Sequence, residues 1–344
     1  MKGKIAVLLL ALLISLGVVF SGCLGPKEKA PAPADRPELK SLAALVGEEN
    51  LSIMHLVGLK AAAAAMKELP FEKAKETVLA LTDSGYPVIE GREGYPQSRY
   101  STTAALDGLM AASGRTRGQG NLIVLGRSIY DPLWFAFFDK ETGECVYLEV
   151  REDILRPYLE DEAAGKADHE GFMALAATGL FKMAKENIAP RELIEAANAE
   201  AWHEKFTAKV FGGNEFSILT VCAVWDKGMS HEFTRAVELH NHICPGLTSG
   251  YYMAQYLDAN FPLGEAERYV VWALPPWCKD DAFQTIFGAT VGKRRMKVTP
   301  CCFLPELHLG DALRDGVEEV LAQEPYAGFV YGMRHHPVCS RCRW

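Results

Sequence analysis

Two histidines and a cysteine alternate in segment 240–246, whose sequence is HNHICPG. In an extended backbone the side chains of His240, His242 and Cys244 would project to one face, and in a helix His240 and Cys244 would still share a face. Pro245 suits the first position of a helix, which places Cys244 at the N-cap, where free amides and the helix dipole favour a thiolate. A thiolate beside two neutral imidazoles is a ligand set for zinc or another borderline transition metal.

A structural interpretation of the same residues stands beside this one. One histidine would cap a turn, the other would be solvated, and the cysteine would be a small buried hydrophobic residue. The density of possible ligands in so short a segment favours the metal site.

The amino terminus resembles a secretory signal sequence, with two lysines before an apolar run from Ile5 to Phe20. This run is shorter than the ~20 residues that a transmembrane helix needs. The small residues before Cys23 resemble the lipobox of prokaryotic lipoproteins, which implies cleavage before Cys23 and attachment of lipid to its sulfur. We therefore predict a signal peptide over residues 1–22, a disordered tether over residues 23–40, and a lipid-anchored position on the extracytoplasmic face of the cell membrane.

Composition narrows the function classes. The chain has 344 residues and a net charge of -8, and no basic block could neutralise a phosphate backbone, so we expect no nucleic-acid partner. It lacks a Walker-type phosphate loop, a Gly-x-Ser-x-Gly elbow and a His-Glu-x-x-His helix, which argues against hydrolases and nucleotidases. A length of ~150 residues per domain predicts two domains, or one of double size, after the tether, with a boundary in segment 207–216.

Six of the nine cysteines lie beyond residue 240. Outside the cytoplasm disulfides persist, so cysteine pairing competes with metal ligation. Cys301 and Cys302 cannot easily pair with each other, but they could join Cys339 and Cys342 of a CxxC motif in a second cluster. The sequence leaves open whether this cluster holds a metal or disulfides.

A block of the second half recurs in the first half with identical spacing. The recurring residues are Asp281, Gly288, Thr290 and Gly292, which match Asp107, Gly114, Thr116 and Gly118. Glycines at fixed places serve backbone turns, so the match predicts a duplicated fold.

The possible ligands do not recur with the glycines. A helical segment precedes each block, and aligning the two segments sets Ser52, Met54 and Leu56 against His240, His242 and Cys244, and Ala104 against Cys278. We therefore expect the first copy to keep the fold and to lose the ligands.

Three motifs of the second half resemble the FmdE family, named for an operon that encodes a molybdenum formylmethanofuran dehydrogenase. They lie in segments 240–247, 278–284 and 288–293, and segments 118–122 and 137–143 of the first half carry weaker traces. The family pattern has a glycine where Asn241 stands. The resemblance implies an α+β fold whose members commonly pair as dimers, some with a carboxy-terminal zinc finger, although only one CxxC of such a finger is present here.

The resemblance also implies how the chain is divided and which residues join the site. A degenerate FmdE-like domain over 41–212 and a second one over 213–344 would pack as a pseudo-dimer within one chain. The family pattern places Cys278 across from the histidines as the fourth metal ligand.

Two polar residues of these motifs, Asp281 and Lys293, have two possible roles each. Asp281 would orient an imidazole from behind, with Gln284 beside it, or it would cap a helix. Lys293 would meet an anionic ligand, or it would be a solvated charge.

Hydrophobic patterns predict an α+β chain. We predict strands over 120–130, 133–138 and 144–150 with a turn at 141–143, a strand over 217–224, and helices over 171–185, 190–206, 232–240 and 306–322.

Together these features predict a membrane-tethered, extracytoplasmic protein that binds or delivers a transition metal, most simply zinc, or a metal-containing cofactor. One alternative is a zinc-dependent enzyme whose metal keeps an open position. A second is a thiol-redox protein that uses Cys244 with Cys278, or Cys339 with Cys342. A third is a haem protein in which the histidines are axial ligands.

Overall fold

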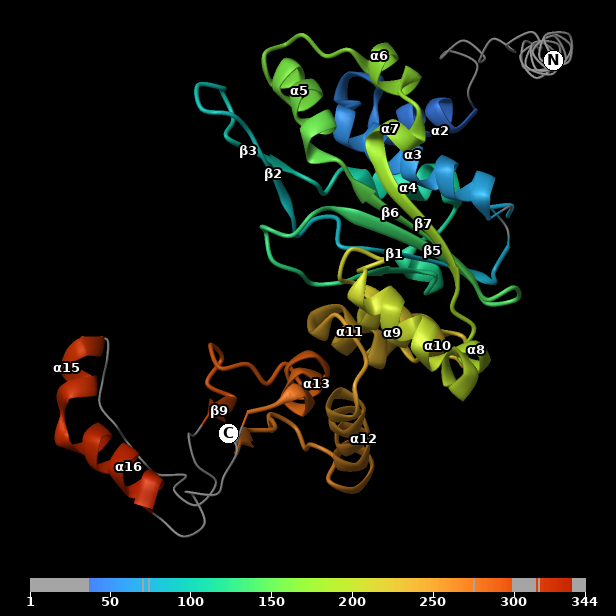
Figure 1. The fold of residues 1–344 in the computed structure, drawn as a ribbon. Coiled ribbons are helices and arrows are strands. Elements are labelled where there is room, and N and C mark those ends of the chain that lie inside the picture. Colours follow the sequence, from blue (N-terminus) through green and yellow to red (C-terminus); the bar gives the residue numbers. More distant parts are fainter. Residues whose placement is uncertain are drawn as a thin grey trace, which may run out of the picture.

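The computed structural model describes residues 37–335, apart from residues 70, 74, 275, 299–313 and 315. It confirms the α+β fold class. A five-stranded sheet of order β4-β1-β5-β6-β7 forms the centre of the first two thirds of the chain, and a two-stranded sheet, β8-β9, lies in the last third (Figure 1). The strands of the large sheet are β1 (Val78–Thr82), β4 (Leu122–Val124), β5 (Trp134–Asp139), β6 (Glu144–Val150) and β7 (Phe181–Asn187).

The remaining elements surround these two sheets. The short strands are β2 (Val88–Glu90) and β3 (Arg99–Ser101), which pair with each other, and β8 (Val271–Ala273) and β9 (Met296–Val298). The helices of the first part are α2 (Pro37–Val46), α3 (Ile53–Glu68), α4 (Ala105–Ser113), α5 (Glu152–Ala163), α6 (His169–Ala174), α7 (Ala177–Leu180), α8 (Pro190–Ile194) and α9 (Ala199–Thr207). Those of the second part are α10 (Glu215–Trp225), α11 (His231–His240), α12 (Pro245–Asn260), α13 (Cys278–Ile286), α15 (Val317–Ala322) and α16 (Glu324–His335).

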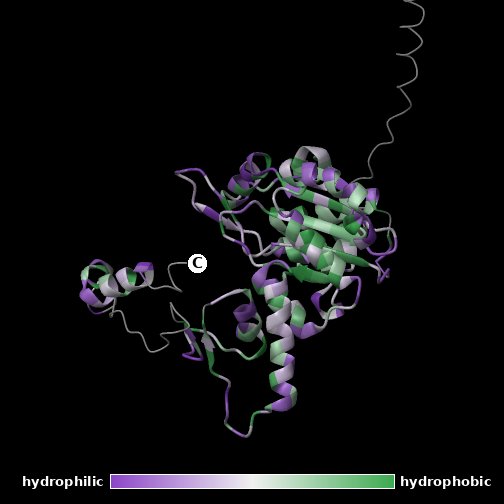
Figure 2. Cartoon of the chain, turned by 60° about the horizontal axis from the view of Figure 1, so that its bottom comes forward, coloured by the Kyte–Doolittle hydropathy of each residue, from purple (hydrophilic) through white to green (hydrophobic). Residues whose placement is uncertain are grey.

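The large sheet is buried on both faces. Successive side chains of β5 point to opposite faces, so Phe135 and Phe137 join a core with α2 to α7, while Trp134 and Phe138 join a second core with α9, α10 and α11. Burial on both sides explains the unbroken apolar sequence of this strand. Figure 2 shows the hydrophobic residues concentrated in this sheet and in the helices next to it. Helices from beyond residue 207 therefore complete the core of the first part.

The predicted strands of the first part are confirmed, with one error. β4 and β6 lie within the predicted segments, β5 extends one residue beyond its segment, to Asp139, and Gly143 makes the turn before β6 with a φ of 76°. The prediction of a helix over 171–185 was wrong in its second half, because β7 starts at Phe181 and pairs antiparallel with β6 along its whole length. Pairing with a neighbouring strand, which local periodicity does not report, decided the conformation of this segment.

In the second part the prediction of a strand over 217–224 was wrong. This segment belongs to α10, which lies against the large sheet. A short apolar run is compatible with a buried strand and with a buried helix. The predicted helix over 232–240 is confirmed as α11. Most of the helix predicted over 306–322 falls outside the described residues, and its end is α15.

The order helix, strand, helix, strand occurs twice, as α3-β1-α4-β4 and as α12-β8-α13-β9. The first helices of the two copies, α3 and α12, have 16 residues each, and the second helices, α4 and α13, have nine each. In each copy the two strands are parallel, and their registers correspond, with Ala80 beside Leu122 and Val271 beside Met296. The structure thus contains the repeat that the recurring glycines predict.

In each copy a glycine allows the two helices to touch. A Cβ on Gly58 would lie 1.8 Å from the carbonyl oxygen of Ala105, and a Cβ on Gly250 would lie 2.2 Å from that of Lys279. This equivalence of Gly58 and Gly250 corrects the helix alignment by one turn. Ser52, rather than Leu56, is the counterpart of Cys244, and both residues cap the helix that follows them.

Among the described residues, no helix is both long enough and apolar enough to span a membrane. The predicted signal peptide lies outside the described residues, and so does most of the predicted tether.

The close contact of α3 and α4 predicts the effect of one added methyl group. Gly58→Ala should lower the free energy of unfolding by about 1–3 kcal/mol, because the methyl group would overlap the backbone of α4. Gly179→Ala is the control, since a Cβ there meets nothing within 4 Å, and it should change stability by less than about 0.5 kcal/mol. Urea unfolding followed by circular dichroism measures both values. Equal stability of Gly58→Ala and the unchanged protein would contradict the helix contact.

Candidate metal centre

The end of α11 is fixed to the sheet of the first part. Glu238 accepts a hydrogen bond at its carbonyl oxygen from the N–H of Gly126, at 2.6 Å, and its carboxylate pairs with Arg117. The Glu238 carboxylate also accepts from the N–H of Val124, on β4, at 3.4 Å. The last residue of α11, His240, is therefore positioned by the large sheet.

Asn241 reverses the chain after α11. It has a φ of 61°, and its N–H donates to the carbonyl oxygen of Val237 at 2.8 Å, which closes the helix. Glycine adopts this left-handed conformation freely and asparagine tolerates it better than most residues. Asn241 therefore makes the turn that glycine makes in the FmdE pattern. The N–H of Ile243 then donates to the hydroxyl of Thr220, on α10, at 3.0 Å.

Cys244 is the N-cap of α12 and Pro245 is its first residue, as the sequence predicts. The Cys244 sulfur accepts a hydrogen bond from the N–H of Leu247 at 3.4 Å. Burial acts to raise the pKa of the thiol, but the hydrogen bonds from Leu247, His240 and Cys278 outweigh it, and the pKa of Cys244 lies below its ordinary value. The helix start thus favours the thiolate, the form that binds metals.

The three side chains converge. One ligand atom of each of His240, His242 and Cys244 lies within 4.8 Å of the other two. Nε2 of His240 is 3.6 Å from the sulfur of Cys244, and the two imidazole rings have centroids 4.4 Å apart. Ligand bonds of about 2.0–2.3 Å in a tetrahedral zinc site place ligand atoms about 3.5 Å apart. The arrangement fits a transition metal.

Asp281 supports the site from behind. Its Oδ2 lies 2.7 Å from Nδ1 of His240, which directs Nε2 of this ring to the ligand group. Gln284 donates to the other carboxylate oxygen at 2.9 Å. The N-cap of α13 is Trp277, so the interpretation of Asp281 as a helix cap was wrong. A carboxylate on the outer nitrogen of a ligating histidine is a common feature of metal sites.

The pKa values of His240 and His242 are shifted in opposite directions. The hydrogen bond to Asp281 raises the pKa of His240, since the carboxylate stabilises the imidazolium. Burial lowers the pKa of His242, and the neighbouring His240 lowers it further. Nδ1 of His242 lies 3.0 Å from the side-chain oxygen of Asn241, which leaves Nε2 of His242 available as a ligand atom. The ring centroids of His242 and Phe216 are 5.2 Å apart.

Cys278, at the start of α13, lies beside this group. A Cβ on Gly246 would be 3.4 Å from the Cys278 sulfur and 3.6 Å from the Cys244 sulfur, so glycine leaves room for both thiols. Burial raises the pKa of Cys278, and so does the adjacent Cys244. The compact group of mutually close ligand atoms nevertheless contains only His240, His242 and Cys244 among the described residues.

The other predicted site residues lie elsewhere. Lys293 is exposed in the turn after α13, where its N–H donates to the hydroxyl of Thr290 at 3.3 Å. Its ammonium group lies against Gly288, and the described residues show no contact between it and the ligand group. The predicted second cluster, Cys301, Cys302, Cys339 and Cys342, falls outside the described residues and stays a prediction.

The corrected alignment reveals a counterpart in the first copy. Ser52 caps α3, and its hydroxyl oxygen lies 2.7 Å from Nδ1 of His55, while Nε2 of His55 is 3.8 Å from Asp107. The first copy therefore keeps an imidazole beside the recurring aspartate, although this histidine comes from α3 itself. Sequence reasoning missed His55. The signal was a histidine three residues after a Ser cap, in a copy that retains the aspartate.

Fold and site together define an α+β protein with a duplicated helix-strand unit and, in the second unit, a His-x-His-x-Cys group that could hold a metal ion. The family model described as FmdE, molybdenum formylmethanofuran dehydrogenase operon, matches residues 51–202 and 239–302, which is more than half of the chain. The chain belongs to the FmdE family. Its two matched segments contain the two repeat units. Among curated proteins, none is similar enough to this chain to count as a relative.

The contact between Asp281 and His240 predicts a pKa change in the metal-free protein. Asp281→Asn should lower the pKa of His240, because the neutral amide no longer stabilises the imidazolium. Since the folded-state pKa of His240 is raised, the pair stabilises the protein below the unfolded pKa, and this stabilisation is lost as the pH rises through the folded pKa. Asp281→Asn should therefore destabilise the protein more at pH 5.5 than at pH 8.

NMR titration of the histidine ring protons measures the pKa, and thermal unfolding at the two pH values measures the stability. Asp107→Asn is the matched control from the first copy, and it should leave the pKa of His240 unchanged. An unaltered His240 titration in Asp281→Asn would contradict the observed hydrogen bond.

Proposed function

We propose that this protein binds a transition metal through His240, His242 and Cys244, and that it holds or delivers this metal, or a cofactor that contains it. The observation that carries the proposal is the convergence of three nitrogen and sulfur ligand atoms within 4.8 Å of one another. The supporting carboxylate of Asp281 and the N-capping position of Cys244 give these ligands the orientation and charge that a metal requires.

Zinc is the metal that we propose first. Imidazole and thiolate ligands suit it, and it is the usual ion of mixed His and Cys sites. The same donors accept copper, nickel, cobalt and iron in other geometries. We propose Cys278 as the fourth ligand, because its sulfur lies next to that of Cys244 and faces the same glycine. A site closed by four protein ligands would serve binding and delivery rather than catalysis.

A zinc-dependent enzyme is the second candidate. The observation in its favour is that the compact group holds three residues and leaves Cys278 outside. Three protein ligands with an open fourth position are the pattern of catalytic zinc sites.

We also propose that the protein is a lipoprotein tethered to the extracytoplasmic face of the membrane. The apolar run before Cys23 and the small residues next to this cysteine support the proposal. The protein would then bind the membrane through its lipid anchor, and it would bind the metal or a small metallo-cofactor through its ligand group.

Metal analysis of the purified full chain tests the binding site. Elemental analysis should find one tightly bound transition-metal ion per chain, and His242→Ala and Cys244→Ala should each lose it or bind it at least tenfold more weakly. His55→Ala, in the first copy, is the matched control and should keep the metal. Full metal content in His242→Ala and Cys244→Ala would contradict the proposal.

X-ray absorption of the metal-loaded protein separates the two candidates. A closed site should show two sulfur ligands, and Cys278→Ser should reduce this number to one. One sulfur ligand in both proteins, with a water or exchangeable ligand in the fourth position, would support the enzyme instead.

The lipid anchor has its own test. Mass spectrometry of the protein from its native membrane should find a lipidated Cys23 as the first residue. Cys23→Ser should prevent attachment of the lipid, so the protein should no longer be anchored to the membrane, and its metal content should be unchanged. An unmodified Cys23 in the native protein would contradict the anchor.

A further inference from the structure

A cavity of about 530 Å³ lies where the large sheet meets the end of α10. Its walls are formed by the segment before β1, the turn after α4, the residue after β5 and the last residue of α10 with the loop that follows it. Sites for small molecules have volumes of about 300–1,000 Å³. The cavity is therefore large enough for a small molecule, and its lining contains none of the three residues of the ligand group.

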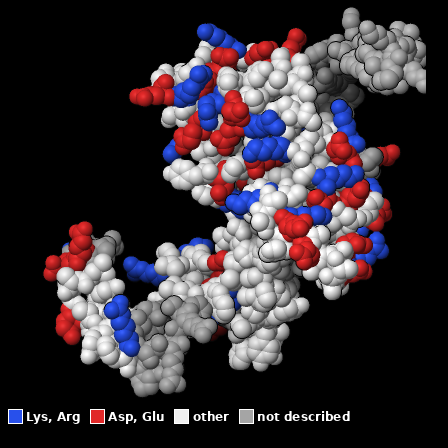
Figure 3. All heavy atoms as spheres, viewed as in Figure 1, with Lys and Arg blue, Asp and Glu red and all other residues white. Residues whose placement is uncertain are grey.

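Positive charge gathers in this cavity. The chain as a whole has a net charge of -8, and Figure 3 shows Lys and Arg intermixed with Asp and Glu over the first part of the chain. The charged residues that line the cavity are Lys73, Lys75, Arg115, Lys140 and Glu76. All but Glu76 are basic, so the cavity differs in charge from the chain around it.

Ion pairs remove only part of this positive charge. Nζ of Lys75 lies 2.8 Å from the carboxylate of Asp139 and 3.1 Å from that of Glu141. In the part of the chain that the structure describes, no carboxylate pairs with Lys73 or Lys140, and the ammonium group of Lys73 donates to a backbone carbonyl oxygen. The lining thus keeps an excess of positive charge.

Arg115 places a buried charge in the cavity wall. Its side chain is 1% exposed. The guanidinium donates to four carbonyl oxygens, those of Lys73, Lys75, Val78 and Ser113. Carbonyl oxygens solvate the guanidinium but bring no net charge, and no described carboxylate pairs with it. A buried cation without a counter-ion is costly, and an anion in the adjoining cavity would offset this cost.

The second copy shows that the repeat does not require this arginine. The turn that follows is the same in both copies, since the hydroxyls of Thr116 and Thr290 each accept a hydrogen bond at 3.3 Å from the N–H three residues further on. Arg115 precedes Thr116, and its counterpart before Thr290 is Ala289, which is also buried. The turn therefore forms with alanine, and the buried charge is peculiar to the first copy.

An indole ring forms another part of the cavity wall. Nε1 of Trp225, the last residue of α10, donates to the carbonyl oxygen of Gly120 at 2.8 Å, which fixes the ring. The ammonium group of Lys140 lies 5.2 Å from the centroid of this ring. A flat ring that stacks on the indole would therefore bring an attached acidic group next to a cation.

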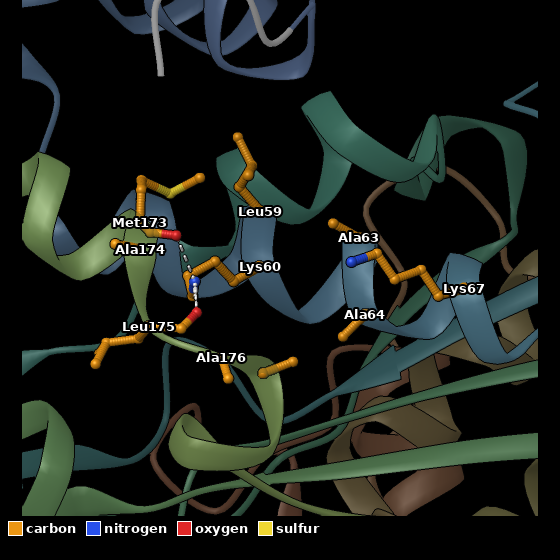
Figure 4. A pocket seen from close by; sticks show the side chains of 10 residues that line it. Leu59, Lys60, Ala63, Ala64, Lys67, Met173, Ala174, Leu175 and Ala176 are labelled. Carbon is orange, nitrogen blue, oxygen red and sulfur yellow. Dashed lines mark hydrogen bonds between the residues drawn. The ribbon is translucent and has the colours of Figure 1, made fainter. Parts of the chain in front are cut away.

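A second hollow in the first part lacks these features. It measures about 230 Å³, lies between α3 and the segment that joins α6 to α7, and is lined mainly by apolar side chains. The ammonium group of Lys60 there donates to the carbonyl oxygens of Met173 and Leu175 at 3.1 and 2.7 Å (Figure 4). This hollow has less room, and its buried cation is bound within the chain.

We propose that the larger cavity binds a small organic anion that joins a flat ring to a phosphate or carboxylate group. The ring stacks on Trp225, and the acidic group is held by Lys140 and by the positive charge of Arg115. Charge-assisted hydrogen bonds of this kind are stronger than neutral ones. This proposal does not depend on metal binding.

Calorimetric titration of the purified full chain in detergent tests the cavity with three probes. Adenosine monophosphate and phthalate each join a flat ring to an acidic group, and adenosine is the uncharged counterpart of the first. At least one of the two anions should bind about tenfold or more tightly than adenosine, because only the anions pair with the cations. The tighter of the two anions identifies phosphate or carboxylate as the group recognised. Binding of neither anion at millimolar concentration would overturn the proposal.

Two charge reversals locate the bound anion. Lys140→Glu should weaken binding by about tenfold or more, because a cation of the cavity is replaced by a carboxylate. Lys166→Glu is the matched control, since Lys166 is an exposed lysine of the first part outside the cavity, and it should bind the anion like the unchanged protein. Circular dichroism shows whether each variant is folded. Equal weakening in both variants would mean that overall charge attracts the anion, and would overturn the proposal.

A titration after metal removal separates this cavity from the ligand group. Phosphate and carboxylate groups also bind metals, so an anion could attach to an ion held by His240, His242 and Cys244. The chain treated with a chelator should bind the anion as tightly as the untreated chain. Loss of anion binding on chelation would place the anion on the metal and overturn the proposal, while leaving the proposed metal site intact.

Discussion

The large sheet must bury both of its faces, and the rest of the molecule follows from this requirement. Its strands carry apolar side chains on both sides, and exposing either side would leave residues such as Phe137 or Trp134 in water. One covering layer comes from α2 to α7, and α9, α10 and α11 supply the other. Because α10 and α11 lie on the sheet, the candidate ligand group, which starts at the last residue of α11, is held by the core of the first part.

The two copies of the repeat differ in their sheets and in the residues at the candidate site. The first copy has a complete sheet and a covered helix, and it retains Asp107 beside His55 but carries serine at the helix cap. In the described residues the second copy has the strand pair β8-β9 and a helix α12 with many exposed side chains, and it carries the thiol and both histidines of the ligand group.

Local patterns predicted the features that depend on nearby residues. A proline after Cys244 indicated a helix start, and the structure confirms Cys244 at the cap. Apolar stretches and turn residues indicated β5, the turn at Gly143 and β6. The strand predicted at 217–224 failed because a short apolar run does not reveal whether a sheet or a helix will bury it. The helix predicted at 181–185 failed because pairing with β6 outweighed local preference.

The sequence by itself identified the candidate ligand group, since two histidines and a cysteine lie within five residues and a proline after Cys244 marks a capping position. It also indicated that the fold repeats, through recurring residues that include Gly114 and Gly288, whose left-handed backbone conformation glycine adopts most readily. Only the tertiary structure decided that Asp281 contacts His240, that Ser52 rather than Leu56 corresponds to Cys244, and that α3 is buried along most of its length. Each of these depends on helices and strands far apart in the chain, whose contacts are set by packing and leave no periodic signal in the sequence.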